Sequence, residues 1–124
     1  MGLFDKFKSN KPKEVKKENP WIPLTEESQL DDILKNSKTK TQAIFKHSTR
    51  CGISSMVMRG FDGPAFPSPE EADVYYLDLL NYRPVSIAIQ DKYGVVHQSP
   101  QLIVLKGGKV VHAASHHDIN VKDI

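Results

Sequence analysis

Blocks of apolar residues alternate with polar segments along the chain, and the spacing within each block predicts its secondary structure. The first block follows Thr25, a suitable N-cap, and places Leu30 and Ile33 at helical spacing. Residues 41–47 (TQAIFKH) have a β-branched and aromatic centre, which favours a strand. A helix followed by a strand is therefore expected first.

Residues 52–61 (GISSMVMRGF) predict a second helix, which a proline-rich loop at 62–69 ends. Ile53 and Met56 recur on one face of this helix, so we expect that face to turn toward the core. Met58 lies off that face and is expected at the surface or in a groove for a client protein.

The second half of the chain predicts a further helix between strands. Residues 73–80 (DVYYLDLL) are rich in aromatic and branched residues and favour a strand. Pro84 suits the first turn of a helix that Gly94 would end, although the β-branched residues at 85–89 fit a strand as well. Residues 101–115 form two apolar runs around a Gly-Gly pair, which is the pattern of a β-hairpin.

The expected order of elements is α-β-α-β-α-β-β-α, with a short last helix within residues 116–124. Helices that alternate with strands predict an α/β fold, with a central mixed sheet of about four strands and helices on both faces. The runs around Gly107 and Gly108 would add an antiparallel C-terminal hairpin at one edge. This order is the thioredoxin-like one, although the pattern alone also fits other α/β arrangements.

Length and composition fit one globular domain. The chain has 124 residues, of which 39% are hydrophobic and 26% charged. Its single cysteine excludes an internal disulfide, and it has no run of about 18 or more apolar residues that would span a membrane. Residues 1–20 lack the apolar core of a signal peptide. We therefore expect a cytoplasmic protein.

The net charge of +2 is concentrated near the N-terminus. Residues 1–20 contain six lysines and three acidic residues, whereas residues 21–124 are close to neutral and carry no basic footprint for nucleic acid. We expect residues 1–20 to be a disordered basic leader and residues 21–124 to be the folded domain. Alternatively, the leader could contact an anionic membrane surface through its lysines and through Leu3, Phe4 and Phe7.

The only cysteine, Cys51, would lie between the end of a strand and the start of a helix. α/β folds bind ligands at this edge of the sheet, and a helix N-terminus stabilises a thiolate, which is the reactive form of the side chain. Arg50 adds a neighbouring positive charge. An isolated cysteine is by itself equally compatible with a small buried apolar residue. In this context the pattern favours a nucleophilic sulfur.

Several separated motifs together resemble one family. CGIS, which begins at Cys51, matches the C-x-x-C motif of thioredoxins with Ser54 in place of the second cysteine, and SPQ precedes the Gly-Gly hairpin. The run KHSTRCGIS…YYLDLLNYRPVSIAI…HQSPQL is similar to the monothiol bacilliredoxins, small bacterial proteins of the bacillithiol system within the thioredoxin-like superfamily. The similarity covers roughly residues 22–120.

The resemblance implies roles for residues around the cysteine. Cys51 would be the redox-active nucleophile, and Ser54 could donate a hydrogen bond to its thiolate. Pro100 would be a cis-proline that faces Cys51, and the backbone of Ser99 would pair with an extended thiol substrate. Gly52 occupies a substrate-binding position where the family pattern, T-C-P-I-S, has proline.

Arg50 is a second departure from that pattern, because it separates the threonine from the cysteine. Together with Arg83 it could bind the carboxylates of an acidic thiol such as bacillithiol or glutathione, although Arg83 could also be a solvated loop residue. Phe45 stands at about the position of the buried acid found beneath many dithiol thioredoxins. A protein without a resolving thiol does not need that base.

The histidines raise two other possibilities. His47 lies four residues before Cys51 and could act as its base, but a surface or edge position is favoured because the turn can separate the two side chains. His112, His116 and His117 suggest a metal site, but adjacent helical side chains point about 100° apart and no paired ligand motif is present. We expect no metal cofactor.

These features predict a monothiol thiol–disulfide exchange protein. The Cys51 thiolate would attack the mixed disulfide of an S-thiolated client protein and take over bacillithiol or a similar low-molecular-weight thiol. A second such thiol would then release Cys51, because no internal disulfide can do so. The alternative is a non-catalytic thioredoxin-fold module for protein binding, in which Cys51 is incidental.

Overall fold

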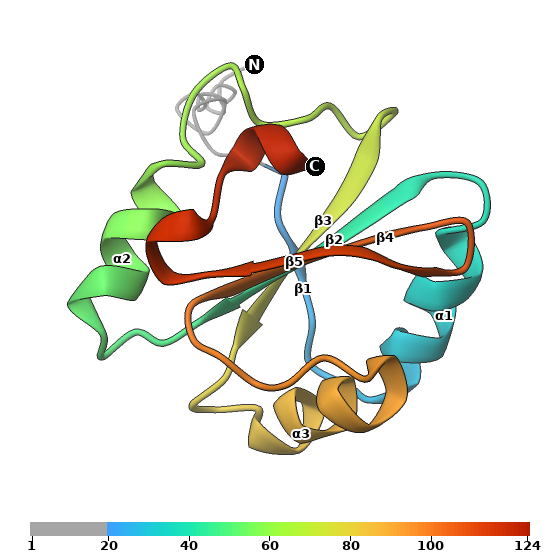
Figure 1. The fold of residues 1–124 in the computed structure, drawn as a ribbon, viewed down its shortest axis with the longest axis horizontal. Helices are drawn as coiled ribbons and strands as arrows, with labels where there is room; N and C mark the ends of the chain where they lie inside the picture. The colour runs from blue at the N-terminus through green and yellow to red at the C-terminus, as the bar shows by residue number, and fades with distance from the viewer. Residues whose placement is uncertain (1–19) are drawn as a thin grey trace, which may run out of the picture.

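The structure, a computed structural model, describes residues 20–124. The leader predicted for residues 1–20 therefore lies, except for Pro20, outside the described residues. The elements are, in chain order, β1 (Ile22–Pro23), α1 (Ser28–Asn36), β2 (Thr41–His47), α2 (Gly52–Arg59), β3 (Ala72–Asp78), α3 (Arg83–Tyr93), β4 (Gln101–Lys106), β5 (Lys109–Ser115), and the 3-10 helices η2 (His116–Asp118) and η3 (Val121–Asp123) (Figure 1).

The five strands form one mixed sheet with the order β1-β3-β2-β4-β5. β2 is parallel to β3 and antiparallel to β4, and β4 and β5 form the predicted hairpin. Its turn residues Gly107 and Gly108 have φ angles of 64° and 83°, the left-handed values that a two-residue hairpin turn favours. The predicted α/β fold is confirmed, but the sheet has five strands rather than about four, because the two residues of β1 pair with β3.

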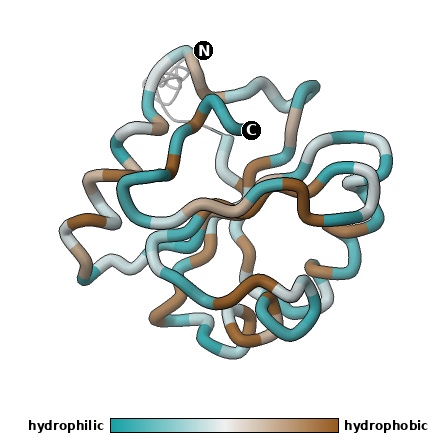
Figure 2. Tube along the Cα trace, in the orientation of Figure 1, coloured by the Kyte–Doolittle hydropathy of each residue, from teal (hydrophilic) through white to brown (hydrophobic). Residues whose placement is uncertain are grey.

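Helices cover both faces of this sheet (Figure 1). α1 and α3 pack on one face, where the buried cluster is built from Leu24, Leu30, Ile33, Ile44, Tyr75, Leu77, Leu79, Val85, Ala88, Ile89, Ile103 and Leu105. α2 lies over the other face, where a smaller cluster includes Phe45, Phe61 and Leu102. Figure 2 shows the apolar segments of the chain running through the strands between these helices.

The helix ends differ in how well the sequence predicts them. α3 has proline in its first turn and ends at Gly94, whose φ is 70°, so the helix is confirmed and the strand alternative for 85–89 is wrong. α1 begins later than predicted and Thr25 is not its N-cap. Instead, the Gln29 side chain accepts hydrogen bonds from the N–H groups of Thr25 and Glu26 at 2.8 and 3.0 Å. The last predicted helix is replaced by two separate 3-10 turns.

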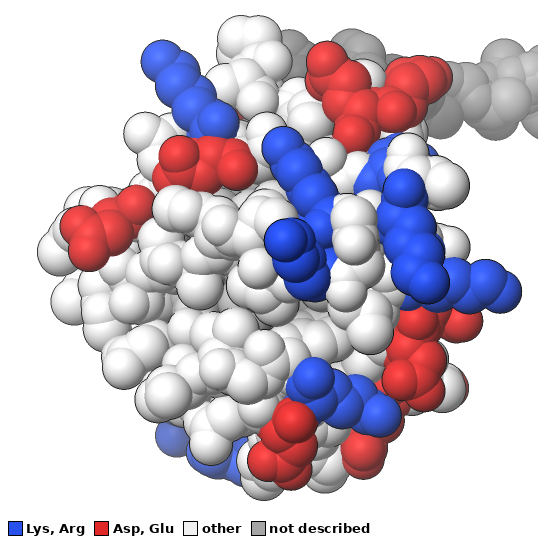
Figure 3. Space-filling model, turned by 45° about the vertical axis from the view of Figure 1, so that its right-hand side comes forward, with Lys and Arg blue, Asp and Glu red and all other residues white. Residues whose placement is uncertain are grey.

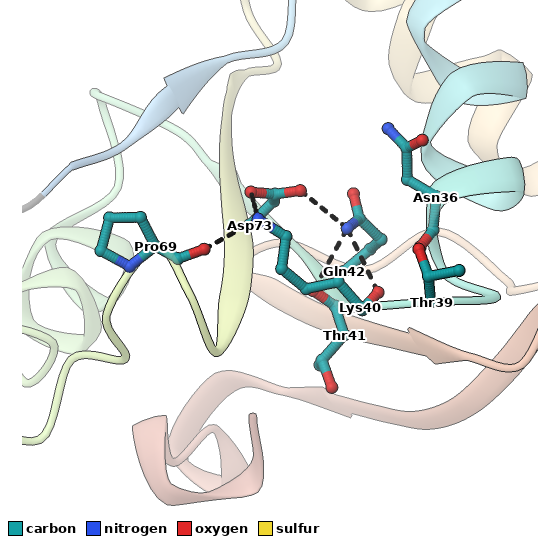
Figure 4. A network of polar contacts seen from close by, with 7 residues as sticks. All are labelled: Asn36, Thr39, Lys40, Thr41, Gln42, Pro69 and Asp73. Carbon is teal, nitrogen blue, oxygen red and sulfur yellow. Dashed lines mark hydrogen bonds and ion pairs between the residues drawn. The ribbon is translucent and has the colours of Figure 1, made fainter.

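A polar network ties the beginnings of β2 and β3 together (Figure 4). Lys40 Nζ lies 2.9 Å from Asp73 Oδ1 and donates to the Pro69 carbonyl at 2.7 Å. Gln42 Nε2 donates to the other oxygen of Asp73 at 2.8 Å. Because β2 and β3 are parallel, both strands begin at this network and end at the opposite edge of the sheet. Cys51 follows β2 at that opposite edge, which the network does not occupy.

The surface of the described residues is mixed in charge. On the face drawn in Figure 3, basic and acidic side chains lie beside one another rather than in separate patches of one sign. Within residues 20–124, no helix combines the length and the apolar character needed to cross a bilayer.

Candidate active site

Cys51 is the N-cap residue of α2. Its backbone is extended (φ −104°, ψ 119°), and its carbonyl accepts the first helical hydrogen bond, from the Ser55 N–H at 3.1 Å. The Cys51 N–H donates to the Ser48 carbonyl at 3.1 Å, which closes the turn after β2. The side chain is half-buried and makes no capping hydrogen bond. The sulfur therefore lies at a helix N-terminus with access to solvent, as the sequence predicts.

The loop before β4 reaches the same edge of the sheet. The Ser99–Pro100 peptide is cis, as the resemblance implied, and Gln101, the next residue, pairs with Lys46 near the end of β2. Within residues 20–124, neither the N–H nor the carbonyl of Ser99 has a hydrogen-bond partner, and its buried hydroxyl has none either. The predicted backbone pairing with a substrate is thus geometrically open.

Ser54 and His47 form a hydrogen-bonded pair at the start of α2. His47 Nδ1 lies 2.7 Å from Ser54 Oγ, which also accepts the Ser48 N–H at 3.1 Å. Ser54 is fully buried and His47 is 5% exposed. The expectation that His47 is a surface or edge residue is therefore wrong, because the end of β2 is covered by α2. The hydrogen bond from Ser54 to the Cys51 thiolate stays a prediction.

The surroundings of His47 favour its neutral form. Burial lowers the pKa of His47, and the Asp78 carboxylate opposes this only in part. The ring stacks on Phe45, with centroids 5.9 Å apart, and contacts Tyr76 at 5.6 Å. A neutral imidazole has one accepting and one donating nitrogen. The tautomer of His47 therefore decides whether the Ser54 proton is held at Nδ1 or is available to another acceptor.

α2 presents a different face to the core than its apolar pattern predicts. Ile53 is 40% and Met56 48% exposed, whereas Val57 and Met58 pack against the cluster around Phe45. The predicted roles of the two methionines are thus reversed: Met56 is exposed and Met58 packs on the core. The face of α2 that is buried begins at Ser54, one residue later than the face that begins at Ile53. Ile53 and Met56 leave apolar surface exposed on α2, the helix that Cys51 caps.

Arg50 and Arg83 lie together. Both line one hollow of about 450 Å³, with Thr49, Leu80 and Asn81 completing its wall. Arg50 directly precedes Cys51 in the chain, although Cys51 is not among the residues that line this hollow. Space is also open in front of Gly52, because a Cβ atom added there would meet no other heavy atom within 4 Å. Binding of a thiol by these residues stays a prediction.

The C-terminal histidines are not gathered into a centre. His112 Nε2 lies 3.3 Å from Asp123 Oδ2, while His116 and His117 belong to η2. In the part of the chain that the structure describes, no group of three or more His, Cys, Asp or Glu side chains is placed to hold a metal ion.

Comparisons with known proteins bear on the family and the fold of this chain. The family model described as monothiol bacilliredoxin BrxC matches residues 22–124. A solved structure provisionally described as an oxidoreductase with a thioredoxin fold is 32% identical, with a TM-score of 0.68 over 81% of this chain and 86% of that chain.

Two thioredoxins are similar in fold alone. Fasciola hepatica thioredoxin is 19% identical, with a TM-score of 0.60 over 77% of this chain and 86% of its own. Thioredoxin O2 of Arabidopsis thaliana is 17% identical, with a TM-score of 0.62 over 82% and 84%. The predicted thioredoxin-like fold is therefore confirmed, and the matches together indicate a thiol redox function.

Proposed function

Because the chain belongs to the monothiol bacilliredoxin family, we propose that it removes bacillithiol, or a similar low-molecular-weight thiol, from protein mixed disulfides. The observation that carries the proposal is the position of Cys51, the half-buried N-cap residue of α2, at the edge of the sheet that the cis Ser99–Pro100 loop also reaches. A helix N-terminus is a position where proteins commonly hold a reactive cysteine, and a thiolate is the form that attacks a disulfide.

The reaction takes two exchanges. The Cys51 thiolate attacks the cap sulfur of the client's mixed disulfide, a new Cys51–cap disulfide forms, and the client leaves as its thiolate. A second low-molecular-weight thiolate then attacks the cap sulfur. The cap leaves as a symmetric small-molecule disulfide, and the Cys51 thiolate is regenerated. In sum, the mixed disulfide and one small thiol become the free client thiol and a symmetric small-molecule disulfide, so the exchange needs no further oxidant or reductant.

The surrounding residues have distinct parts in this scheme. The backbone of Ser99 pairs with the extended part of the substrate, and Arg50 and Arg83 neutralise carboxylates of the thiol in their shared hollow. The His47–Ser54 pair is a positioning device. When Nδ1 of His47 carries the proton and donates to Ser54, the Ser54 hydroxyl is free to donate to the thiolate.

The test is transfer of the cap. A client protein carrying a single bacillithiol mixed disulfide is mixed with the reduced protein, and intact mass spectrometry follows the cap on both partners. We expect the added mass to leave the client and appear on Cys51. If Cys51 reacts readily with an alkylating reagent but takes no cap from the client, the exchange function is wrong and a binding role gains support.

A further inference from the structure

A fully buried lysine lies on the face of the sheet opposite His47. Lys46 precedes His47 in β2, so its side chain points to the side covered by α3, and its exposed fraction is 0%. Its Nζ lies 3.2 Å from His97 Nδ1. Within residues 20–124, no carboxylate forms an ion pair with Lys46. Burial lowers its pKa to about 8, which still leaves the ammonium mostly protonated at neutral pH.

His97 connects this lysine to the surface. It lines a hollow of about 210 Å³ whose wall consists of Leu79, Arg83, Ser86, Ile87, Gln90 and His97. An ammonium group only donates hydrogen bonds, so Nδ1 of His97 accepts from Lys46, and the neutral ring offers Nε2–H as its remaining donor. None of the residues that line the hollow is acidic.

Two cationic side chains that have no carboxylate partner among residues 20–124 thus stand at this hollow, Arg83 in its wall and Lys46 behind His97. Burial lowers the pKa of His97, and the nearby charges of Lys46 and Arg83 lower it further. A buried charge without a counter-ion is costly, and an anion placed among these groups would relieve that cost. At about 210 Å³ the hollow is smaller than the roughly 300–1,000 Å³ of pockets that hold whole ligands, which suits a small anionic group.

Resting on the proposed function, we infer that this hollow binds a carboxylate of the low-molecular-weight thiol through Arg83 and His97, with Lys46 behind them. Arg83 also lines the hollow that contains Arg50, the residue that precedes Cys51 in the chain. Arg83 thus belongs to both hollows, and in this proposal an acidic thiol bound to Cys51 reaches past Arg83 to His97. An acidic side chain of a client protein has the same chemistry, but the small volume favours the compact end of a free thiol.

The direct test is a titration of the protein with succinate, a small dicarboxylate, and with succinamide, its neutral counterpart. Binding is followed by the NMR shifts of the Ser86 and Gln90 amides. We expect succinate but not succinamide to shift them, and His97→Gln or Lys46→Met to raise the dissociation constant about tenfold, the size of one charge-assisted hydrogen bond. Lys92→Gln is the matched control, since Lys92 lies on α3 but pairs with Asp31 away from the hollow.

The second arm measures how fast glutathione, which carries two carboxylates, releases a capped Cys51. His97→Gln should slow this release about tenfold. The inference is overturned if succinamide binds as well as succinate, if Lys92→Gln weakens binding as much as His97→Gln, or if release by glutathione is unaffected. It is also overturned if His97→Gln slows cap transfer from the client instead, because the hollow would then bind a client carboxylate. The succinate titration needs no exchange at Cys51, so a failure of the proposed function is distinguishable from a failure of this site.

Discussion

Replacing Ser54 by alanine tests the buried pair at the start of α2. In the structure, Ser54 Oγ has two partners, His47 Nδ1 at 2.7 Å and the Ser48 N–H at 3.1 Å. The substitution leaves His47 Nδ1 without a partner in a buried place. It also frees the Ser48 N–H, but Ser48 is only half-buried, so water can replace that bond.

The expected loss of stability follows from these two sites. A buried polar atom that loses its partner costs about 1–3 kcal/mol, whereas an exposed one costs little. Alanine gains back a few tenths of a kcal/mol because it is the better helix former. We therefore expect Ser54→Ala to lower the free energy of unfolding by about 2 kcal/mol. That is a large part of the roughly 5–15 kcal/mol that stabilises an ordinary domain.

Urea unfolding measures this difference, and Ser55→Ala is the matched control. Ser55 lies on the same helix and is half-buried, and its hydroxyl has no hydrogen bond within the described residues. With a urea slope of about 1–2 kcal/mol per M, Ser54→Ala should move the midpoint down by about 1 M or more, while Ser55→Ala should leave it nearly unchanged. Equal midpoints for the two variants would refute the view that the His47–Ser54 pair stabilises the site.

Three further predictions concern the reaction and its surroundings. Cys51→Ser should abolish transfer of the cap from a client, and full activity of this variant in the mass assay would exclude the single-thiol mechanism. Arg50→Ala should slow the transfer by less than about tenfold, because the charge of Arg50 is one of several influences on the thiolate. Ser54→Cys restores the C-x-x-C spacing, so oxidation should give an internal disulfide. Mass spectrometry would show this bond as a loss of two hydrogens, and thiol titration as a loss of both free thiols. The absence of the bond would contradict the placement of residues 51 and 54 on one helical turn. Because burial lowers the pKa of Lys46 from 10.5 to about 8, the unfolded chain binds more protons than the folded one between these values. The stability of the wild type relative to Lys46→Met should therefore rise with pH across this window, and a difference that stays flat in urea unfolding would count against a buried ammonium.

The sequence predicted best those elements that local chemistry determines. The hairpin follows from two glycines that take left-handed φ angles, and α3 follows from Pro84 in its first turn and Gly94 after its end. The site position of Cys51 also follows locally, because a strand, a short turn and a helix meet there. β1 was missed because two residues carry no periodic signal, and their strand conformation depends on pairing with Tyr75 and Tyr76 in β3.

The inward face of α2 could not be read from apolar periodicity. Two overlapping sets of positions fit a helix, one that begins at Ile53 and one that begins a residue later at Ser54. The set that begins at Ile53 starts with an apolar residue, but the set that begins at Ser54 is the one that faces the core. Ser54 can be buried because its hydroxyl forms hydrogen bonds with the His47 ring and the Ser48 N–H. A polar residue is stable in the core when its hydrogen bonds are made, and that condition depends on residues outside the helix.

The end of β2 shows why the absence of a buried acid is compatible with monothiol chemistry. At about the position where many dithiol thioredoxins have that acid, this chain has Phe45, which packs against Trp21 and Phe61 in the core. The buried ionisable groups instead follow directly, at Lys46 and His47, and alternation along the strand sends them to opposite faces of the sheet. Neither is an acid that would deprotonate a resolving thiol, and the chain has no such thiol. His47 Nδ1 lies 2.7 Å from the hydroxyl of Ser54, the residue at the position of a resolving thiol. Lys46 lies on the opposite face of the sheet, behind His97 in the hollow that Arg83 also lines. Under the proposed function, His47 would orient Ser54 toward the Cys51 thiolate, and Lys46 would favour binding of the acidic thiol that releases the cap.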